Sequence, residues 1–186
     1  LDGLMADASH LILHVFAREL RELPGLLRSG EADLIVLDRE LGEGDFENVA
    51  LGFERNVLVE SAAGPTRNAL LDHDPDDATT ERFFQLNRRP KSTPAGPAAP
   101  ADIQFARASR SFLDDIYGIL DGVVRGWGRA VVSQHLVAAM PGIRVVPGYL
   151  PLVTPVVLVV RKSAFRSRIE ARAIEAIRSR CARDLA

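Results

Sequence analysis

Short apolar runs alternate with amphipathic segments along most of the chain, and this alternation restricts the fold more than any other feature. The runs at 34–37 and 151–160 consist mainly of Leu, Ile and Val, which is typical of strands. The segments 112–124 and 165–184 repeat apolar residues every three or four positions, which indicates helices with one buried face. Strands that alternate with helices predict an α/β fold.

The composition excludes several classes of protein. The chain has 186 residues, a net charge of −2 and 47% hydrophobic residues, so it can bury a core and is not basic enough for a stand-alone nucleic-acid binder. Cys181 is the single cysteine, which excludes an internal disulfide and a cysteine-cluster zinc site. No apolar run approaches 18 residues, so we expect no transmembrane helix and no membrane partner. The single cysteine fits a reducing compartment, and the expected location is cytoplasmic.

The first third of the chain predicts a helix, a turn and a strand. Residues 4–23 have a helical rhythm that Pro24 and Gly25 would end or kink. A short helix closed by Gly30 then leads into the strand 34–37, whose unbroken apolar run indicates cover on both faces. Further strands are expected at 49–53, 56–61, 69–71, 103–106 and 143–146, with helices at 78–86 and 135–139.

Capping and proline signals divide the middle of the chain. Asp74 before Pro75 is a plausible start for the helix near 78, and Ser109 or Ser111 is a plausible cap for the helix 112–124. The proline-rich stretch 87–101 predicts an extended, mobile loop.

Three stretches, in the same order along the chain, resemble the effector-binding domain of LysR-type transcriptional regulators. Residues 27–36 (LRSGEADLIV) are similar to the family pattern L-x-x-G-x-x-D-L-x-I. Residues 120–136 (LDGVVRGWGRAVVSQHL) are similar to V-x-x-G-x-G-x-A-x-L-P-x-x-L, with Ser133 where the family often has proline. Residues 155–161 and the helix that follows resemble the strand and helix that close the family's first lobe.

The resemblance implies a two-lobed fold of the periplasmic-binding-protein type 2, with two hinge crossovers. Lobe I would comprise 1–61 plus 152–186, and lobe II would comprise 62–151. A small molecule would bind in the cleft between the lobes, and two such domains would pair side by side. The winged helix-turn-helix of the family is absent from this chain, so DNA would be bound only through a domain that is not present here.

The function implied is that of an effector-sensing and oligomerisation domain of a LysR-type regulator. The effector would be a small anion, an organic acid, and the domain would form a homodimer or a higher homo-oligomer. A free-standing solute-binding protein of the same fold is the alternative. An enzyme on the same scaffold is a third hypothesis, but no catalytic constellation and no cofactor motif supports it.

Candidate effector-binding residues lie where the predicted helices begin and the strands end, because unpaired amide groups and strand ends commonly contact ligands there. For each place the alternative is an ordinary helix cap or a solvated ion pair. The candidates are Ser9 and His10 beside Asp7 and Ala8, Asp38 beside Arg39, Asp72 and His73 beside Asp74, and Ser109, Arg110 and Ser111.

The spacing of the residues gives less support to a metal site or to a hydrolase triad. The Asp72-His73-Asp74 run and the pair His10 and His14 could be imagined as metal ligands, but capping explains the first and the second lacks an HExxH pattern. Ser133 and His135 could belong to a hydrolase triad, but no Gly-x-Ser-x-Gly elbow surrounds the serine. We therefore predict neither a metal site nor catalytic residues.

Overall fold

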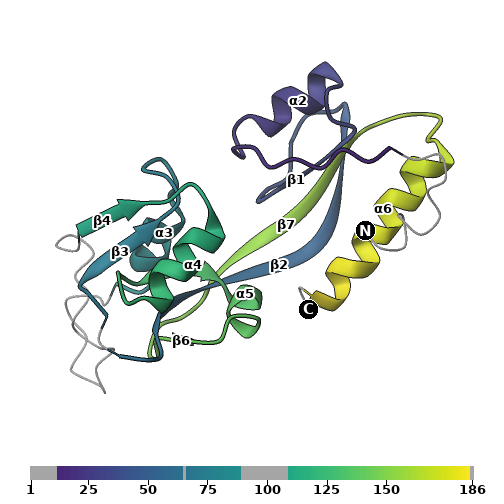
Figure 1. Cartoon of the computed structure of the whole chain (residues 1–186). Helices are drawn as coiled ribbons and strands as arrows, with labels where there is room; N and C mark the ends of the chain where they lie inside the picture. Colours follow the sequence, from purple (N-terminus) through teal and green to yellow (C-terminus); the bar gives the residue numbers. More distant parts are fainter. Residues whose placement is uncertain (1–11, 65, 89–108, 185–186) are drawn as a thin grey trace. The chain divides into compact units, whose positions relative to one another are not determined.

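The chain forms two compact units, and it passes from one unit to the other twice. A computed structural model describes residues 12–64, 66–88 and 109–184. Unit 1 comprises Leu1–Glu54 and Thr154–Ala186, and unit 2 comprises Arg55–Val153. The crossings fall within two long strands, β2 (Phe46–Ser61) and β7 (Leu152–Arg161), which are labelled in Figure 1. Among the described residues, no helix combines the length and apolar character needed to cross a membrane.

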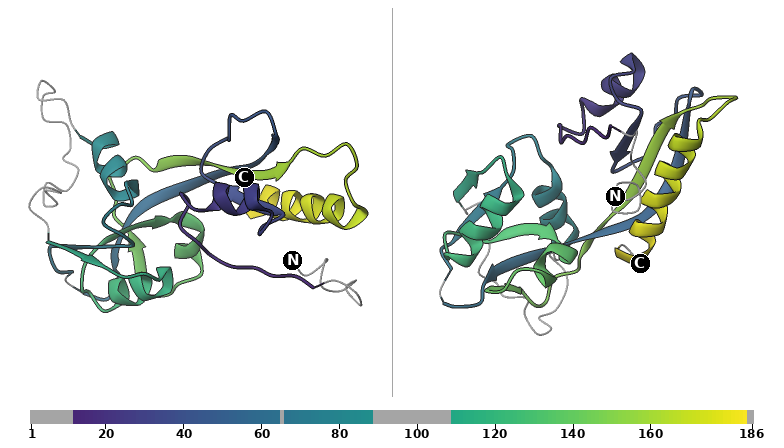
Figure 2. Two further views of the ribbon diagram at one scale, coloured as in Figure 1. Left: turned by 90° about the horizontal axis from the view of Figure 1, so that it is seen from above. Right: turned by 45° about the vertical axis from the view of Figure 1, so that its right-hand side comes forward.

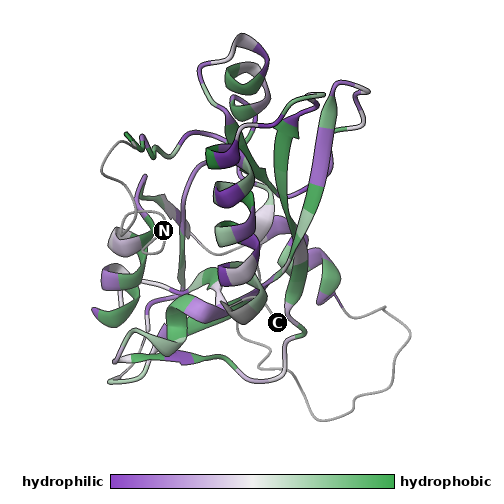
Figure 3. Ribbon diagram, turned by 90° about the vertical axis from the view of Figure 1, so that its right-hand side faces the viewer, coloured by the Kyte–Doolittle hydropathy of each residue, from purple (hydrophilic) through white to green (hydrophobic). Residues whose placement is uncertain are grey.

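Unit 1 is a small antiparallel sheet with one helix on each face. Strand β1 (Leu34–Leu37) pairs antiparallel with β7, from Leu34 opposite Val160 to Leu37 opposite Val157. The helix α2 (Leu23–Ser29) closes one apolar cluster through Leu27, and α6 (Arg168–Asp184) closes the other through Ile174. Figure 2 shows α6 lying along the strands that it covers. In Figure 3, purple hydrophilic residues are interspersed with hydrophobic ones along α6, as expected for a helix with one buried side.

The predicted helix over 4–23 is wrong for the described residues 12–22, which contain no helix. Helix α2 instead begins at Leu23, and Pro24 lies in its first turn. Proline lacks a backbone N–H and has a fixed φ, so it is tolerated at a helix start, where that N–H would have no partner. The prediction that Gly30 ends this helix is confirmed, since Gly30 adopts a φ of 81° at the C-cap.

Strand β1 is not covered on both faces as its sequence predicts. Ile35 and Leu37 are buried against α2, but the side chain of Val36 is 42% exposed. The strand lies at the end of the sheet order β1-β7-β2-β5, so it is an antiparallel edge strand rather than a central parallel one. An unbroken apolar run in the sequence therefore does not distinguish an antiparallel edge strand from a central parallel strand that is covered on both faces.

Unit 2 combines a parallel strand pair with the second half of β2. Strands β3 (Ala69–Asp72) and β4 (Ser109–Phe112) are parallel, while β5 (Ala130–Ser133) and β6 (Ile143–Val145) pair antiparallel with β2. Helix α4 (Ile116–Val124) packs on one apolar cluster, and α3 (Thr79–Leu86) packs on another; α5 (Gln134–Ala138) follows β5 directly.

Three predictions in this region need correction. The expected strands 49–53 and 56–61 form one strand, β2, which runs without a break from Phe46 to Ser61 and pairs with β7, β5 and β6. Ser109 and Ser111 lie within strand β4 and cap no helix; α4 is capped by Asp115, whose Oδ2 accepts a hydrogen bond from the Gly118 amide at 2.8 Å. Pro75 does not start α3, which begins four residues later.

The other element predictions are confirmed within one to three residues. They are the strands at 69–71, 143–146 and 151–160 and the helices at 78–86, 135–139 and 165–184. The expected strand 103–106 lies outside the described residues, and so does most of the proline-rich stretch 87–101.

Candidate functional site

Strands β3, β4 and β5 of unit 2 end at one edge, where β2 begins its pairing with β5. Strands β3 and β4 are parallel, and Leu70 also bridges to Arg129 in parallel, so the segment leading into β5 runs the same way as β3. Strand β2 runs antiparallel to β5 and starts its pairing at this edge, with Asn56 opposite Ser133. We call this the carboxyl edge of unit 2, and ligands of α/β proteins commonly bind at such edges.

Asp72 is the buried anchor of the carboxyl edge. Its side chain is 5% exposed, and its Oδ2 accepts a 2.6 Å hydrogen bond from Nη2 of Arg110 on the neighbouring strand. Its Oδ1 accepts a hydrogen bond from the Thr80 hydroxyl at 3.1 Å and another from the His73 amide at 3.1 Å. A charged, fully bonded carboxylate therefore fixes the position of the Arg110 guanidinium, which remains 28% exposed.

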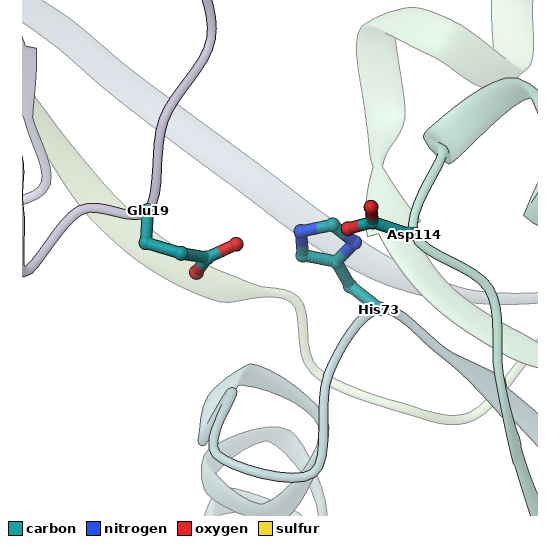
Figure 4. A group of neighbouring side chains, drawn as sticks. All are labelled: Glu19, His73 and Asp114. Atoms are coloured by element: carbon teal, nitrogen blue, oxygen red, sulfur yellow. The ribbon is translucent and has the colours of Figure 1, made fainter.

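His73 follows Asp72 and lies beside the end of β4. Its Nδ1 is 3.4 Å from the carbonyl oxygen of Leu113. Figure 4 shows its imidazole next to the carboxylate of Asp114, with a ring nitrogen and a carboxylate oxygen within 4.8 Å of each other. One imidazole and one carboxylate of unit 2 are too few ligands to define a metal site. They can instead exchange hydrogen bonds with a polar small molecule.

Ser133 and His135 stand at the end of β5. The Ser133 hydroxyl oxygen is 2.7 Å from Nδ1 of His135, and Ser133 itself is 6% exposed. Asn56, directly opposite on β2, is also 6% exposed. The Ser133 hydroxyl therefore has a hydrogen-bonding partner in His135, as buried polar groups usually do.

Glu60 marks the other end of the β2–β5 pair. Its carboxylate receives hydrogen bonds from Nε of Arg129 at 2.9 Å and from Nη2 of Arg144 at 2.8 Å. Burial raises the pKa of Glu60, but the hydrogen bonds and positive charges of the two arginines outweigh burial and hold its pKa below the ordinary value. This charged group ties β2 to β6 and to the segment that leads into β5.

The predicted site residues are only partly brought together. Asp72, His73 and Arg110 meet at the carboxyl edge, whereas Ser109 lies at the opposite end of β4, opposite Ala69. Ser111 is exposed within the strand.

In unit 1, Asp38 follows β1 and accepts a 2.8 Å hydrogen bond from Nη1 of Arg39, which is the solvated pair that the sequence allowed as an alternative. Ser9 and His10 lie outside the described residues.

Neither Asn56 nor Asp114 is among the predicted site residues, and the sequence suggested Ser133 only as a nucleophile. No local motif marks Asn56, because its place beside Ser133 arises from pairing between residues 77 positions apart. Asp114 could have been suspected, since it follows β4 where the chain turns into α4.

The chain matches a known family over nearly its whole length. The family model described as "LysR substrate binding domain" matches residues 1–182. No curated protein sequence matches the chain significantly.

Several solved structures share this fold. Full-length LTTR LysG from Corynebacterium glutamicum with bound effector Arg has a TM-score of 0.76 at 18% identity, over 99% of this chain and 63% of that one. ArgP from Mycobacterium tuberculosis has a TM-score of 0.72 at 18% identity, over 97% of this chain and 62% of that one. The regulatory domain of HypT from Salmonella typhimurium (apo-form) has a TM-score of 0.70 at 15% identity, over 98% of this chain and 90% of that one.

These likenesses show that the chain has the type 2 periplasmic-binding-protein fold of LysR regulatory domains. The chain spans less than two thirds of the LysG and ArgP chains. The matching family consists of regulator domains and not of enzymes.

Proposed function

Because the chain belongs to the LysR substrate binding domain family, the effector-binding domains of LysR-type transcriptional regulators, we propose that it senses a small organic acid. The effector's carboxylate binds at the carboxyl edge of unit 2, where it meets Arg110 and His73. A domain of this kind transmits a signal when its ligand binds one conformation of the protein more tightly than another.

The observation that carries this proposal is the bonding of Asp72. A guanidinium has five N–H donors in a planar fork, so a carboxylate that fixes one of them leaves a rigid group that can also bind a ligand carboxylate. The 2.6 Å bond to Asp72 supplies that rigidity, and Thr80 in turn fixes Asp72. His73 adds an imidazole at the same edge.

The chain divides into unit 1, Leu1–Glu54 with Thr154–Ala186, and unit 2, Arg55–Val153. We propose that they act as the lobes I and II that the family resemblance implies. LysG binds arginine as its effector, but the two sequences share only 18% identity, so this proposal does not name arginine as the acid.

We further propose that the domain pairs with a second copy, as part of a cytoplasmic regulator that binds DNA through another domain. Phe165 and Ile169, near the start of α6, expose large apolar side chains at 93% and 56%. Light scattering of the purified chain is expected to give the mass of a dimer, and a monomer at micromolar concentration would contradict the pairing.

A thermal-shift screen tests the sensing function. At least one small carboxylic acid among a broad set of metabolites is expected to raise the melting temperature, because a ligand that binds only the folded state stabilises it. Arg110→Gln should remove that shift while the exposed variant Arg82→Gln, on α3 of the same unit, keeps it. A set of acids that leaves the melting temperature unchanged would contradict the proposal.

A further inference from the structure

Phe112 ends strand β4 with an exposed aromatic ring beside Arg110. The residue is 44% exposed, and it joins none of the four apolar clusters that the described residues form. Carbon ζ of Arg110 lies 5.1 Å from the centre of the ring, a distance at which a guanidinium and an aromatic face attract each other. Part of the ring therefore contacts the guanidinium, and part remains exposed next to it.

Arg110 is held by a carboxylate and by this ring. Nη2 of Arg110 donates a 2.6 Å hydrogen bond to Oδ2 of Asp72, and Asp72 lies opposite Phe112 in the register of β3 and β4. Arg110 and Phe112 are two residues apart on one strand, so their side chains point to the same face of the sheet. A ligand carboxylate pairs with a guanidinium in the guanidinium plane, so the group that carries the carboxylate would lie along the exposed part of the ring.

Carboxylates beside the ends of β3 and β4 disfavour a second negative charge on the ligand. Asp114 follows Phe112 by two residues, and Asp74 follows Asp72 by two residues. Neither Asp114 nor Asp74 forms an ion pair with a described residue. The charge of Arg110 is already compensated by Asp72, so a second negative group would be repelled by the carboxylates around it. A ligand with one carboxylate and an uncharged body fits these charges.

The exposed ring favours an aromatic body over an aliphatic one. Covering apolar surface that water would otherwise contact favours any apolar group, whether aromatic or aliphatic. An aromatic group gains more, because the positive edge of one ring attracts the negative face of another. Such pairs bind about threefold or more tightly than the burial of area alone predicts. Phe112 can therefore distinguish an aromatic acid from an aliphatic acid of equal size.

We propose that the acid bound at Arg110 is an aromatic monocarboxylic acid, whose ring packs against Phe112 while its carboxylate pairs with the guanidinium. This inference rests on the proposed sensing function and specifies the class of its ligand. Phe112 determines the preference for an aromatic body, and Asp114 and Asp74 act against a second negative group.

Calorimetric titration of the full chain with matched acids tests the ligand class. The probes are benzoate, phenylacetate and 3-phenylpropionate, each compared with the cyclohexyl acid of equal carbon number. At least one aromatic acid is expected to bind about threefold or more tightly than its cyclohexyl partner. Phthalate, which adds a second carboxylate to benzoate, is expected to bind about tenfold more weakly than benzoate.

Variants at Phe112 show whether the ring causes the preference for the aromatic acid. Phe112→Leu keeps an apolar side chain and should bring the ratio of the two affinities to about one. Phe112→Tyr keeps the ring and should keep the ratio. Phe53→Leu, at a phenylalanine of β2 that is 59% exposed, is the matched control and should also keep it.

The ratio of affinities also separates a role in specificity from a structural role. If Phe112 only holds Arg110 in position, Phe112→Leu weakens the binding of the aromatic and the cyclohexyl acid equally, and their ratio is unchanged. That result would overturn the inference even if both affinities fall.

The outcomes distinguish this inference from the function on which it rests. Cyclohexyl acids that bind as tightly as their aromatic partners in all three pairs, in an Arg110-dependent manner, overturn the aromatic class and leave the sensing function intact. Phthalate that binds as tightly as benzoate also overturns the inference alone. Failure of every carboxylic acid to bind overturns both.

Discussion

Nη2 of Arg110 donates a 2.6 Å hydrogen bond to Oδ2 of Asp72 across the parallel strands β4 and β3. The two residues are 38 positions apart, and the Asp72 side chain is 5% exposed. Because the carboxylate is buried and fully bonded, the pair both stabilises the β3–β4 connection and orients a partly exposed guanidinium at the carboxyl edge. Stability and ligand binding are therefore coupled at this one contact.

Asp72→Asn is expected to destabilise unit 2. The substitution keeps the shape of the side chain but removes the negative charge that compensates Arg110, and losing a charged hydrogen bond at a buried group costs about 1–3 kcal/mol. Urea unfolding followed by circular dichroism measures the difference. The matched control is Asp38→Asn, whose exposed ion pair with Arg39 is worth at most about 1 kcal/mol. Equal losses in the two variants would contradict the anchoring role of Asp72.

Gly128→Ala is expected to destabilise the fold by about 1–3 kcal/mol, through overpacking of a tight contact. A Cβ at this position would lie 2.8 Å from the carbonyl oxygen of Ala69, which belongs to the backbone of β3 and cannot move aside cheaply. Gly118→Ala is the control, because the nearest atom there is Oδ2 of Asp115 at 3.5 Å and alanine favours a helix. A Gly128→Ala protein as stable as the control would show that β3 and the 128–133 segment are not in close contact.

Glu60 gives the fold a predicted pH dependence. Burial raises its pKa, but the hydrogen bonds from Arg129 and Arg144 prevail, so the pKa in the folded state lies below the ordinary value of 4.5. A carboxyl group with a lowered folded pKa contributes stability above its unfolded pKa and loses it as the pH falls through the folded one. Glu60→Gln should therefore be less stable than the parent protein at pH 7, and the difference should shrink as the pH falls below about 4.5.

Unfolding in urea at pH 7, 5, 4 and 3 measures that difference. A gap between parent and Glu60→Gln that stays constant down to pH 3 would contradict the lowered pKa. Glu54→Gln, on the same strand, is a suitable control for the general effect of removing one carboxylate from β2.

Local patterns in the sequence predict most elements of this fold. Helix α3 and strand β7 were expected at nearly their observed positions, because a short amphipathic repeat and a valine-rich run are strong local signals. The prediction of a helix over 4–23 is wrong because a helical repeat of apolar residues does not ensure that another element packs against them. Val15 and Phe16, which were expected among its apolar residues, are 71% and 43% exposed. Pro24 was interpreted as a stop, although proline equally suits a start.

The residues of the candidate site were likewise predicted only in part from local patterns in the sequence. Asp72, His73 and Arg110 were selected because each lies beside a predicted strand end or helix start, and two of them are joined directly. Asn56 could not be selected, because its neighbour Ser133 is set by the register of β2 against β5, and register depends on the packing of both faces. Ser109 was misjudged because a cap and a strand start have similar sequences.

The most direct test of the account is a crystal structure of the chain with the acid that gives the largest thermal stabilisation. The account predicts the ligand carboxylate within hydrogen-bonding distance of Arg110, with the guanidinium still bonded to Asp72. A ligand bound away from the ends of β3 and β4, or one that displaces Asp72 from Arg110, would contradict it.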